Sequence, residues 1–390
     1  MTPTKIMIVT GEASGDLHGA NLLRALQAQL PGLKACGMGG HELASHGMEI
    51  LFDAAKVSVV GIVEVLSHLK DILKALQVLR RRLSEDRPDL LILIDLPDFN
   101  LMLARKAKAL GIPIFYYISP QVWAWRSGRT RTIKKRVDKI GVILPFEEDF
   151  FKKYGVDAEY VGHPLLDTVR VSEDRKAFLS RHDLAADSTC IGLLPGSRKR
   201  EIASLLPIFL TAARLMQKRS THRLTFLLPQ ASTITSRDLD DAGLPLFQQE
   251  LDIRIVKEDR YTMMAACDAV MAASGTVTLE LAILQVPMVV CYRLSPLTFR
   301  LAKMMVKLDH FSLVNLIAGY TAVPELLQDE VTPENIAGEL MALLTIPEKM
   351  HTMKTALQGI KDKLGEAGAS EKAAAVAIRL LQKHHDDGKQ

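Results

Sequence analysis

The chain has 390 residues and a formal net charge of +4, with 48% hydrophobic and 24% charged residues. This composition predicts a folded globular protein large enough for two domains and excludes a disordered chain. The small net charge does not indicate a nucleic-acid-binding protein, so we expect no nucleic-acid partner. Four widely spaced cysteines form no Cys-x-x-Cys pair, which indicates reduced thiols in a cytoplasmic protein rather than a disulfide framework.

The N-terminal apolar run, residues 5–10, is too short for the core of a signal peptide and predicts the first strand of a sheet. No stretch reaches the ~20 apolar residues that a bilayer-spanning helix requires. We therefore expect any membrane contact to be made from one side.

Short apolar runs alternate with amphipathic segments along the whole chain. The predicted strands are residues 6–10, 90–95, 114–118, 141–144, 190–195, 224–228, 253–256, 269–273 and 288–292. The predicted helices are residues 17–30, 65–83, 101–110, 201–219, 276–284, 333–344 and 369–384. Continuous apolar strands separated by helices are typical of parallel sheets that are covered on both faces.

One order of elements, strand then glycine loop then helix, occurs twice, at residues 6–30 and again at 190–219. A proline-containing, charge-rich stretch lies between the two copies, around residues 162–187. The repeat predicts an α/β protein with two Rossmann-like domains that face an interdomain cleft, where ligands bind at the carboxyl ends of the strands.

We place the first domain at residues 1–170 and the second at residues 171–365, with the hinge at 165–185. The last segment, residues 366–390, contains a further amphipathic helix. This helix either completes the second domain or packs back on the first, and the sequence leaves both placements open.

The loop after the first predicted strand contains Gly15, Asp16 and His18 as well as Glu12. It has no Gly-x-Gly-x-x-Gly pattern, which argues against a dinucleotide-binding enzyme. Ionisable side chains at the end of a first strand are predicted to line a substrate site. Ser14 or Asp16 is also suited to cap the following helix, and both interpretations are compatible.

The predicted helix at residues 65–83 has leucines and other apolar residues on one face and basic residues on the rest. This pattern fits a core-facing helix with a basic outer side. It fits equally a helix that lies on an anionic membrane surface. The sequence leaves both interpretations open.

Asp95 and Asp98 follow a very apolar predicted strand, residues 90–94. A partly desolvated carboxylate at this edge of a sheet is suited to act as a general base on a substrate hydroxyl. Two carboxylates also suit a metal ion, but no further ligand is nearby in the sequence. We therefore expect no metal.

Both tryptophans of the chain, Trp123 and Trp125, lie in the segment Ser-Pro-Gln-Val-Trp-Ala-Trp-Arg at residues 119–126. Two indoles so close together, followed by Arg126, predict a shaped substrate-binding loop rather than core packing alone. A dense basic stretch continues to Lys139. It is either a solvated surface or a contact for a phosphorylated substrate or anionic lipid headgroups.

Leu-Pro-Gly-Ser-Arg at residues 194–198 stands between a predicted strand and a predicted helix. Gly196 allows a phosphate to approach the backbone, and Ser197 and free backbone N–H groups can donate hydrogen bonds to it. Arg198 adds a guanidinium suited to a diphosphate. We prefer this interpretation to an ordinary strand–helix turn.

A second small-residue turn, Ser274, Gly275 and Thr276, follows another predicted strand and opens another helix. These residues are predicted to line a further part of the nucleotide pocket. Glu280 lies one helical turn later, where a carboxylate can accept hydrogen bonds from sugar hydroxyls. A glutamate on a helix surface is usually only solvated, so the preceding motif carries this prediction.

Together these segments resemble the lipid-A-disaccharide synthase family of bacterial glycosyltransferases, over nearly the whole chain. The segments that carry the resemblance are Gly-Glu-Ala-Ser-Gly-Asp at 11–16, Gly-Ile-Val-Glu-Val-Leu at 61–66, Asp-Leu-Pro-Asp-Phe-Asn at 95–100, the two-tryptophan segment at 119–126, Leu-Pro-Phe-Glu at 144–147, Val-Gly-His-Pro at 161–164, Leu-Leu-Pro-Gly-Ser-Arg at 193–198, Ser-Gly-Thr at 274–276, Met-Val-Val-Cys-Tyr-Arg at 288–293 and Asn-Leu-Ile-Ala-Gly at 315–319. Gly-His-Pro occurs across related UDP-sugar transferases, whereas the two-tryptophan segment is highly specific.

The resemblance implies a B-type glycosyltransferase that joins UDP-2,3-diacylglucosamine to 2,3-diacylglucosamine 1-phosphate in lipid A biosynthesis. The products are the β-1,6-linked disaccharide 1-phosphate and UDP, with inversion at the anomeric carbon and without metal or other cofactor. The resemblance also implies a peripheral location on the cytoplasmic face of the inner membrane, in contact with anionic lipids. A homodimer and a monomer both stay open.

The resemblance implies roles for single residues as well. Asp98 matches the catalytic carboxylate of the family, and Arg198 matches the arginine that binds the diphosphate. Glu280 and Asn315 match positions near the nucleotide. The first domain is then expected to bind the acceptor and the second the UDP-sugar donor.

Two other functions fit part of the sequence. A UDP-sugar epimerase or hydrolase would use the same Arg198 pocket but would need no groove for acyl chains. A non-catalytic membrane-surface protein would use residues 65–83 and the basic stretch. The clustered carboxylates Asp95 and Asp98 argue against this second alternative.

Overall fold

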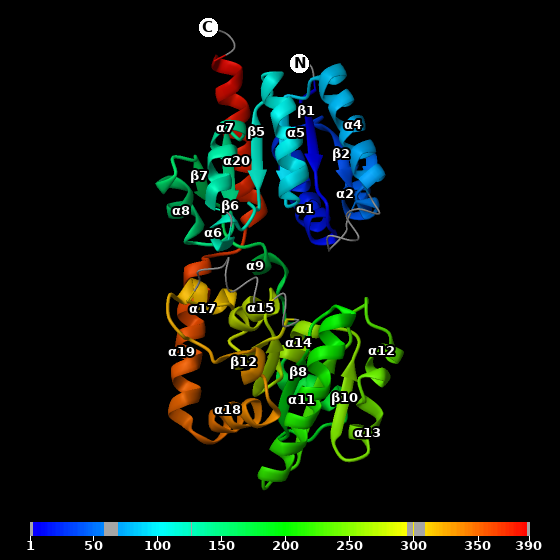
Figure 1. Cartoon of the computed structure of the whole chain (residues 1–390), viewed down its shortest axis with the longest axis vertical. Helices are drawn as coiled ribbons and strands as arrows, with labels where there is room; N and C mark the ends of the chain where they lie inside the picture. The colour runs from blue at the N-terminus through cyan, green and yellow to red at the C-terminus, as the bar shows by residue number, and fades with distance from the viewer. Residues whose placement is uncertain (1–2, 58–68, 126, 295–298, 300–308, 388–390) are drawn as a thin grey trace. The chain divides into compact units, whose positions relative to one another are not determined.

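The computed structural model describes residues 3–57, 69–125, 127–294, 299 and 309–387 (Figure 1). The chain divides into two compact units: an N-terminal unit of residues 1–164 and 366–390, and a C-terminal unit of residues 165–365. Each unit has its own parallel sheet with helices, which confirms the predicted fold class.

The N-terminal unit is built on a seven-stranded sheet with strand order β3-β2-β1-β4-β5-β6-β7, in which every neighbouring pair is parallel. Its strands are β1 Lys5–Val9, β2 Lys34–Gly39, β3 Glu49–Asp53, β4 Leu90–Ile94, β5 Ile114–Tyr117, β6 Lys139–Val142 and β7 Ala158–Tyr160. Its helices are α1 Ala13–Gln29, α2 His41–Ser45, η1 Ala54–Lys56, α4 Leu69–Asp86, α5 Pro97–Ala109, α6 Val122–Trp125, η2 Ser127–Arg129, α7 Thr130–Arg136, α8 Glu147–Lys153 and α20 Ala369–Asp387.

The C-terminal unit is built on a six-stranded parallel sheet with strand order β10-β9-β8-β11-β12-β13. Its strands are β8 Thr189–Leu194, β9 Leu224–Pro229, β10 Asp252–Val256, β11 Ala269–Ala273, β12 Met288–Tyr292 and β13 Glu325–Leu327. Its helices are α9 Leu165–Thr168, α10 Arg175–Arg181, α11 Lys199–Arg219, α12 Ser236–Asp241, α13 Leu244–Gln248, α14 Arg260–Ala265, α15 Val277–Ile283, α17 Leu313–Ala318, η3 Gln328–Glu330, α18 Pro333–Thr345 and α19 Pro347–Leu364.

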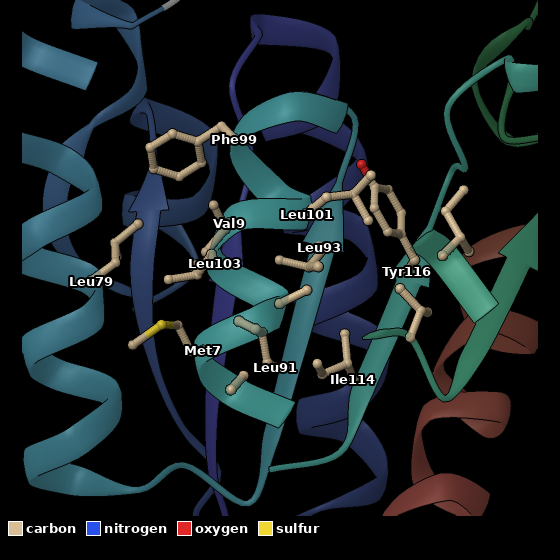
Figure 2. Close-up of a cluster of buried hydrophobic side chains, with 14 of the residues drawn as sticks. Met7, Val9, Leu79, Leu91, Leu93, Phe99, Leu101, Leu103, Ile114 and Tyr116 are labelled. Atoms are coloured by element: carbon tan, nitrogen blue, oxygen red, sulfur yellow. The ribbon is translucent and has the colours of Figure 1, made fainter. Parts of the chain in front are cut away.

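The central strands of the N-terminal sheet are buried on both faces, as their continuous apolar sequences predict. In β1, Met7 and Val9 point into the core cluster that α4 and α5 cover, and Figure 2 shows these side chains among leucines of β4 and α5. Ile6 and Ile8 point to the opposite face, where α1 and α20 form the other cluster. All five residues of β4 are buried.

Four strands were absent from the sequence prediction: β2, β3, β7 and β13. β2 has the sequence Lys-Ala-Cys-Gly-Met-Gly, and its glycines interrupt the apolar pattern. The other three are short strands at the edges of their sheets and are mostly half-buried. Edge strands are not covered on both faces, so their sequences show no continuous apolar run.

The last helix, α20, packs on α1 and belongs to the N-terminal unit. Ala373, Ala374 and Ala377 of α20 are fully buried in the same core cluster as Leu22 and Leu23 of α1. Of the two placements that the sequence left open, α20 therefore takes the one on the first domain.

The exposure of the leucines of helix α4 differs between its two ends. Leu76, Leu79 and Leu83 are buried in the core, whereas Leu69 and Leu73 are 45% and 56% exposed. The helix therefore contains a core-facing part, as one interpretation predicted, and an exposed apolar start. The first residues of the predicted helix, 65–68, and the segment 61–66 lie outside the described residues. In the part of the chain that the structure describes, no helix meets the length and hydropathy needed to cross a bilayer.

Candidate functional site

Both sheets place their predicted binding loops where the strand order reverses. In the N-terminal unit this point lies between β1 and β4, and in the C-terminal unit between β8 and β11. Open parallel sheets bind ligands at the carboxyl ends of strands at such switch points. The loops and first helical turns there contain Glu12–Asp16 and Asp95–Asp98 in one unit, and Gly196–Arg198 and Ser274–Thr276 in the other. Each unit thus has its own candidate site.

The turn after β4 is strained and firmly held. Asp95 and Leu96 have φ values of 50° and 41°, a left-handed conformation that is uncommon for residues with a side chain. The carbonyl oxygen of Asp95 accepts hydrogen bonds from Asn100 Nδ2 at 2.7 Å and from the hydroxyl of Tyr116. Strain of this kind persists where the surroundings over-determine it, and it is concentrated at functional sites.

The carboxyl group of Asp95 lies against the start of α1. A Cβ atom on Gly15 would come within 3.1 Å of Asp95 Oδ2, so glycine at this position leaves room for the carboxyl. Burial, and secondly the negative charge of Glu12, raise the pKa of Asp95 to about 7. A carboxyl that titrates near neutrality can take up or release a proton at physiological pH.

Asp98 lies in the first turn of α5, and its side chain is 74% exposed. It forms an ion pair with Arg129, the last residue of η2. Asp98 is therefore accessible at the same sheet edge as Asp95, with a cation beside it. No sequence pattern indicates this pairing, because the two residues lie on different elements.

Asp16 has a structural role. Its carboxylate is 5% exposed and accepts hydrogen bonds from the backbone N–H groups of Gly40 at 2.6 Å and Glu42 at 2.9 Å. These groups are at the start of α2, so Asp16 caps that helix from α1. The Asp16 side chain is turned toward α2 because unpaired helix N–H groups attract a carboxylate. The substrate contact predicted for Asp16 stays a prediction.

His18 and His163 come close together although they are far apart in the sequence. His163 follows β7 and is 5% exposed. Burial, and secondly the neighbouring His18, lower the pKa of His163 to about 4. The His163 imidazole is therefore neutral at physiological pH. The fold thus joins the first predicted loop to the Val-Gly-His-Pro segment.

The loop after β5 is anchored by Glu147, which is 1% exposed. Glu147 Oε1 accepts hydrogen bonds from Trp123 Nε1 at 3.0 Å and Ser119 Oγ at 3.5 Å. Its Oε2 accepts the backbone N–H groups of Leu144 at 3.0 Å and Ile143 at 3.3 Å. Burial raises the pKa of Glu147 to about 7, although these hydrogen bonds favour the ionised form. The sequence prediction assigned no separate role to Glu147.

Trp123 is half-buried, and its ring meets the ring of Phe146 edge-on, with centroids 5.0 Å apart. Ile118, just before the loop, has a φ of 58°, which is an outlier for a β-branched residue. Arg126 and the side chain of Trp125 lie outside the described residues. The substrate contacts predicted for Trp123, Trp125 and Arg126 stay predictions.

In the C-terminal unit, the loop after β8 is closed by Glu201. Glu201 Oε2 accepts the backbone N–H groups of Ser197 at 3.0 Å and Arg198 at 3.1 Å. The prediction that these N–H groups are free to bind phosphate is therefore wrong. A glutamate at the third position of a helix reaches back to cap its own N-terminus. The Arg198 guanidinium, 70% exposed and 3.5 Å from Glu201 Oε1, stays available to an anion.

Gly196 has a φ of 112°, and a Cβ atom there would lie 2.2 Å from Glu201 Oε2. Glycine is needed at this position because the capping carboxylate occupies the space beside it. Gly196 therefore shapes the loop that carries Arg198.

The turn after β11 is more open. Gly275 and Thr276 are exposed, and a Cβ atom on Gly275 would meet nothing within 4 Å. Ser274 is half-buried, and its hydroxyl donates a hydrogen bond to the carbonyl of Phe311 at 3.4 Å. This turn offers open space and polar groups at the switch point, and its contact with a nucleotide stays a prediction.

Glu280 is buried and paired with Arg260. Its Oε1 accepts hydrogen bonds from Arg260 Nη2 at 2.8 Å and from the hydroxyl of Tyr261 at 3.4 Å. Burial raises the pKa of Glu280, and Arg260 opposes this effect. Within the described residues no donor contacts Oε2, so one oxygen can still accept a ligand hydroxyl. Arg260 gave no signal in the sequence because it lies on a separate element.

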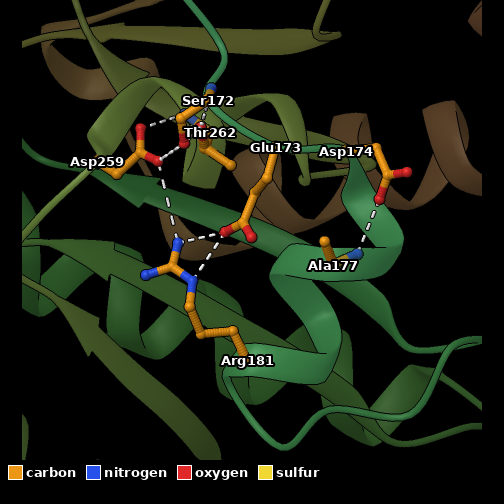
Figure 3. Close-up of polar contacts among 7 residues, drawn as sticks. All are labelled: Ser172, Glu173, Asp174, Ala177, Arg181, Asp259 and Thr262. Atoms are coloured by element: carbon orange, nitrogen blue, oxygen red, sulfur yellow. Dashed lines mark hydrogen bonds and ion pairs between the residues drawn. The ribbon is translucent and has the colours of Figure 1, made fainter.

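The start of α14, beside the arginine that pairs with Glu280, is fixed by the polar contacts in Figure 3. Asp259 has a φ of 52° and accepts hydrogen bonds from the backbone N–H of Thr262 at 3.3 Å and from the Ser172 hydroxyl. The backbone N–H of Ser172 donates to Thr262 Oγ1 at 2.9 Å, and Arg181 lies 3.9 Å from Asp259. These contacts fasten α14 to the segment before α10.

Asn315 is fully buried and holds a turn of its own unit. Its Oδ1 accepts the backbone N–H groups of Ala322 at 2.8 Å and Val323 at 3.0 Å, and its Nδ2 donates to the Val323 carbonyl at 2.9 Å. The amide satisfies buried backbone groups, which would be costly to leave unpaired. The position of Asn315 near the nucleotide stays a prediction.

Within the described residues, no group of three or more His, Cys, Asp or Glu side chains is arranged to hold a metal ion.

Solved structures of similar fold include UDP-GlcNAc 2-epimerases and glycosyltransferases. The chain is similar to a UDP-GlcNAc 2-epimerase from Neisseria meningitidis bound to UDP-GlcNAc, with 13% identity, a TM-score of 0.62, and coverage of 97% of this chain and 100% of that one. It is also similar to MurG from Acinetobacter baumannii, with 14% identity, a TM-score of 0.62, and coverage of 97% and 99%. At this identity the likeness concerns the fold, which is that of the B-type glycosyltransferases.

Two relatives at much higher identity carry the same name. The lipid-A-disaccharide synthase of Syntrophus aciditrophicus is 45% identical over 387 residues, which is 98% of this chain and 99% of that protein. The lipid-A-disaccharide synthase of Trichlorobacter lovleyi is 46% identical over 380 residues, 97% of this chain and 98% of that protein. The model of the family described as lipid-A-disaccharide synthetase matches residues 6–379. The chain therefore belongs to the lipid-A-disaccharide synthetase family and is a glycosyltransferase.

Proposed function

We propose that this enzyme transfers a diacylglucosamine unit from UDP-2,3-diacylglucosamine to the 6-hydroxyl of 2,3-diacylglucosamine 1-phosphate. The products are the β-1,6-linked lipid A disaccharide 1-phosphate and UDP. The family match over residues 6–379 is the observation that carries this proposal. The carboxylates at the β1–β4 switch point and the exposed arginine at the β8–β11 switch point support it.

The donor is assigned to the C-terminal unit. Arg198 would bind the diphosphate through its exposed guanidinium, and the open turn at Ser274–Thr276 would take the rest of the nucleotide. Oε2 of Glu280 would accept a ribose hydroxyl while Oε1 stays with Arg260. Two solved structures of similar fold are described as bound to UDP-GlcNAc and to UDP, which is consistent with this assignment.

The acceptor is assigned to the N-terminal unit, with Asp98 as the general base. Asp98 would take the proton of the acceptor 6-hydroxyl while that oxygen attacks the anomeric carbon from the side opposite UDP. The bond between the anomeric carbon and the UDP oxygen breaks, and UDP leaves with the electron pair. Arg129 would hold the Asp98 side chain in place. Asp95 is the alternative base because it titrates near neutrality.

A direct assay tests this function. Purified enzyme is incubated with the UDP-linked donor and the 1-phosphate acceptor, and the products are analysed by mass spectrometry. A disaccharide 1-phosphate and an equal amount of UDP are expected, without epimerisation of the donor alone. Donor epimerisation or hydrolysis without disaccharide would instead assign the enzyme to one of the other UDP-sugar reactions.

The enzyme is further proposed to work on the cytoplasmic face of the inner membrane. Leu69 and Leu73 are exposed at the start of α4, and the neighbouring Lys70 and Lys74 are exposed as well. Apolar side chains with adjacent cations are suited to an anionic lipid surface, where the acylated substrates also reside.

A further inference from the structure

Glu147 joins two loops that are separate in the sequence. One carboxylate oxygen, Oε1, accepts hydrogen bonds from Trp123 and Ser119, in the loop after β5. The other oxygen, Oε2, accepts the backbone N–H groups of Leu144 and Ile143, which follow β6. Each carboxylate oxygen therefore accepts hydrogen bonds from one of the two loops, and Glu147 is 1% exposed.

We propose that Glu147 is a positioning residue that holds the two-tryptophan loop, residues 119–125, in the conformation that binds the acylated acceptor sugar. This inference rests on the proposed function, because it takes the N-terminal unit as the acceptor side. Glu147 does not touch the substrate itself. It acts by fixing the indole of Trp123.

The location of this loop connects it with the candidate site. It follows β5, the strand next to β4, and the Tyr116 hydroxyl of β5 donates to the carbonyl of Asp95 in the strained turn after β4. Ile118 enters the loop with a φ of 58°, a second point of strain at the same sheet edge. Strained residues at such an edge are typical of substrate-binding segments.

The indole of Trp123 is suited to an acylated sugar. Its N–H donates a hydrogen bond to Glu147 and its ring packs at right angles to that of Phe146, yet the side chain is only half-buried. A tryptophan whose polar atom is satisfied by protein presents an apolar ring to a ligand. Apolar C–H groups of a pyranose or the start of an acyl chain are the matching chemistry.

A glutamine at position 147 cannot accept hydrogen bonds from both loops. Its single oxygen can accept from the Trp123 side or from the Leu144 side, and its NH₂ group then faces an N–H donor on the other side. Two facing donors repel each other, so one loop must move. Because Leu144 and Ile143 belong to the backbone after β6, we expect the loop with Trp123 to be the one displaced.

Tryptophan fluorescence, excited at a wavelength where tyrosine does not absorb, reports on this loop alone because Trp123 and Trp125 are the only tryptophans of the sequence. The Glu147→Gln variant is expected to shift the emission maximum of the substrate-free protein. The matched control is Glu148→Gln, since Glu148 is the next residue of α8 and also accepts a backbone N–H, that of Tyr160 at 3.0 Å. The control is expected to keep the wild-type emission.

Kinetics with the full-length enzyme provides the second measurement. A displaced binding loop should lower kcat/KM for the acceptor by roughly 10–100-fold. Donor binding, measured as UDP affinity, should stay within about twofold because UDP is assigned to the other unit. A wild-type enzyme that makes no disaccharide would refute the proposed function, whereas the emission shift needs no substrate and is judged separately.

If Glu147→Gln fails to fold, the Trp123→Phe variant tests the same contact, since phenylalanine keeps an aromatic ring and lacks the N–H donor. If Glu147→Gln does fold, it is combined with Trp123→Phe in a double variant. The double variant is expected to lose no more acceptor kcat/KM than the more impaired of the two single variants. The proposal would be overturned by a wild-type emission spectrum of Glu147→Gln. It would equally be overturned by an unchanged acceptor kcat/KM in either single variant, or by additive losses in the double variant.

Discussion

Three non-glycine residues with positive φ, Asp95, Leu96 and Ile118, lie at the carboxyl ends of the neighbouring strands β4 and β5. Hydrogen bonds from Asn100 and Tyr116 hold the first of these turns. A side chain in this conformation costs free energy, which the buried core of the unit must offset. Among the described residues of the N-terminal unit, only Arg87 has a positive φ outside this sheet edge, apart from the glycines.

Replacing Asp98 tests the proposed base. Asp98→Asn keeps the size of the side chain but removes its capacity to take a proton, so turnover should fall by about 10²–10⁴-fold. UDP affinity should not change. Initial rates and calorimetry with UDP measure the two quantities. Asp149→Asn, an exposed change on α8 of the same unit, is the matched control. Near-normal turnover in Asp98→Asn, with a loss in Asp95→Asn, would assign the base to Asp95.

The pKa of Asp95 predicts a dependence of stability on pH. The folded value of about 7 lies above the ordinary value of 3.8, so the folded state binds more protons between these pH values. The contribution of Asp95 to stability is therefore present at low pH and is lost as the pH rises through about 7.

Asp95→Asn cannot ionise and should escape this loss. The free energy of unfolding of Asp95→Asn minus that of wild type should be larger at pH 8 than at pH 5, by about 1–3 kcal/mol. Urea unfolding at both pH values measures the difference. Glu147 also has a pKa of about 7 but is present in both proteins, so its effect cancels. An equal difference at both pH values would contradict the assignment.

Arg198→Ala should weaken UDP binding by about 1.5–3 kcal/mol, the range for a hydrogen bond to a charged group. The guanidinium is 70% exposed and partly paired with Glu201, so we do not expect a larger effect. Isothermal calorimetry with UDP gives the affinity. Arg219→Ala, at the far end of the same helix α11, is the control. Equal UDP affinity in both variants would remove Arg198 from the donor site.

At the scale of elements, α4 has a buried part and an exposed apolar start, which the sequence did not separate. Leu76, Leu79 and Leu83 are core residues, and truncating Leu79 to alanine should cost about 2–5 kcal/mol of stability. Leu69 and Leu73 are exposed, so they contribute little to the core and are free to contact a lipid surface.

The double variant Leu69→Glu with Leu73→Glu tests the membrane contact. A leucine that enters the lipid interface contributes about 1.5–3 kcal/mol, so binding to anionic vesicles should fall by tenfold or more while the melting temperature stays the same. Vesicle flotation measures the binding. Leu246→Glu is the control, because Leu246 is 69% exposed on α13 of the other unit. Unchanged flotation of the double variant would exclude the start of α4 as the contact.

At the scale of the whole molecule, the chain leaves the N-terminal unit after residue 164 and returns to it at residue 366. The C-terminal unit is one continuous stretch, whereas the N-terminal unit needs its last helix. Buried alanines of α20 cover the side chains of Leu22 and Leu23 on α1. The two units therefore differ in how they depend on the end of the chain.

Deleting residues 366–390 should expose this apolar surface and destabilise the N-terminal unit alone. Scanning calorimetry should show one transition lowered or lost and the other kept. Added UDP should still raise the kept transition, because the donor site is assigned to residues 165–365. Loss of both transitions, or an unchanged N-terminal transition, would contradict this division of stability.

Much of the architecture could be read from local pattern. Apolar runs such as Leu90–Ile94 predict buried parallel strands because only strands covered on both faces are apolar throughout. The alternation of strand and helix then places each following loop at the carboxyl edge of a sheet. For this reason the predicted motifs at Asp95–Asp98, Gly196–Arg198 and Ser274–Thr276 do lie at the switch points.

What the tertiary structure alone decided is which polar groups are already satisfied by protein. Asp16 binds backbone N–H groups that lie 24 and 26 residues further along the chain. Glu280 and Glu147 accept hydrogen bonds from Arg260 and Trp123, which lie on other helices. These contacts join residues that are far apart along the chain or on different elements. A local pattern shows which side chains can form hydrogen bonds, but only the packed fold determines which partner is within reach.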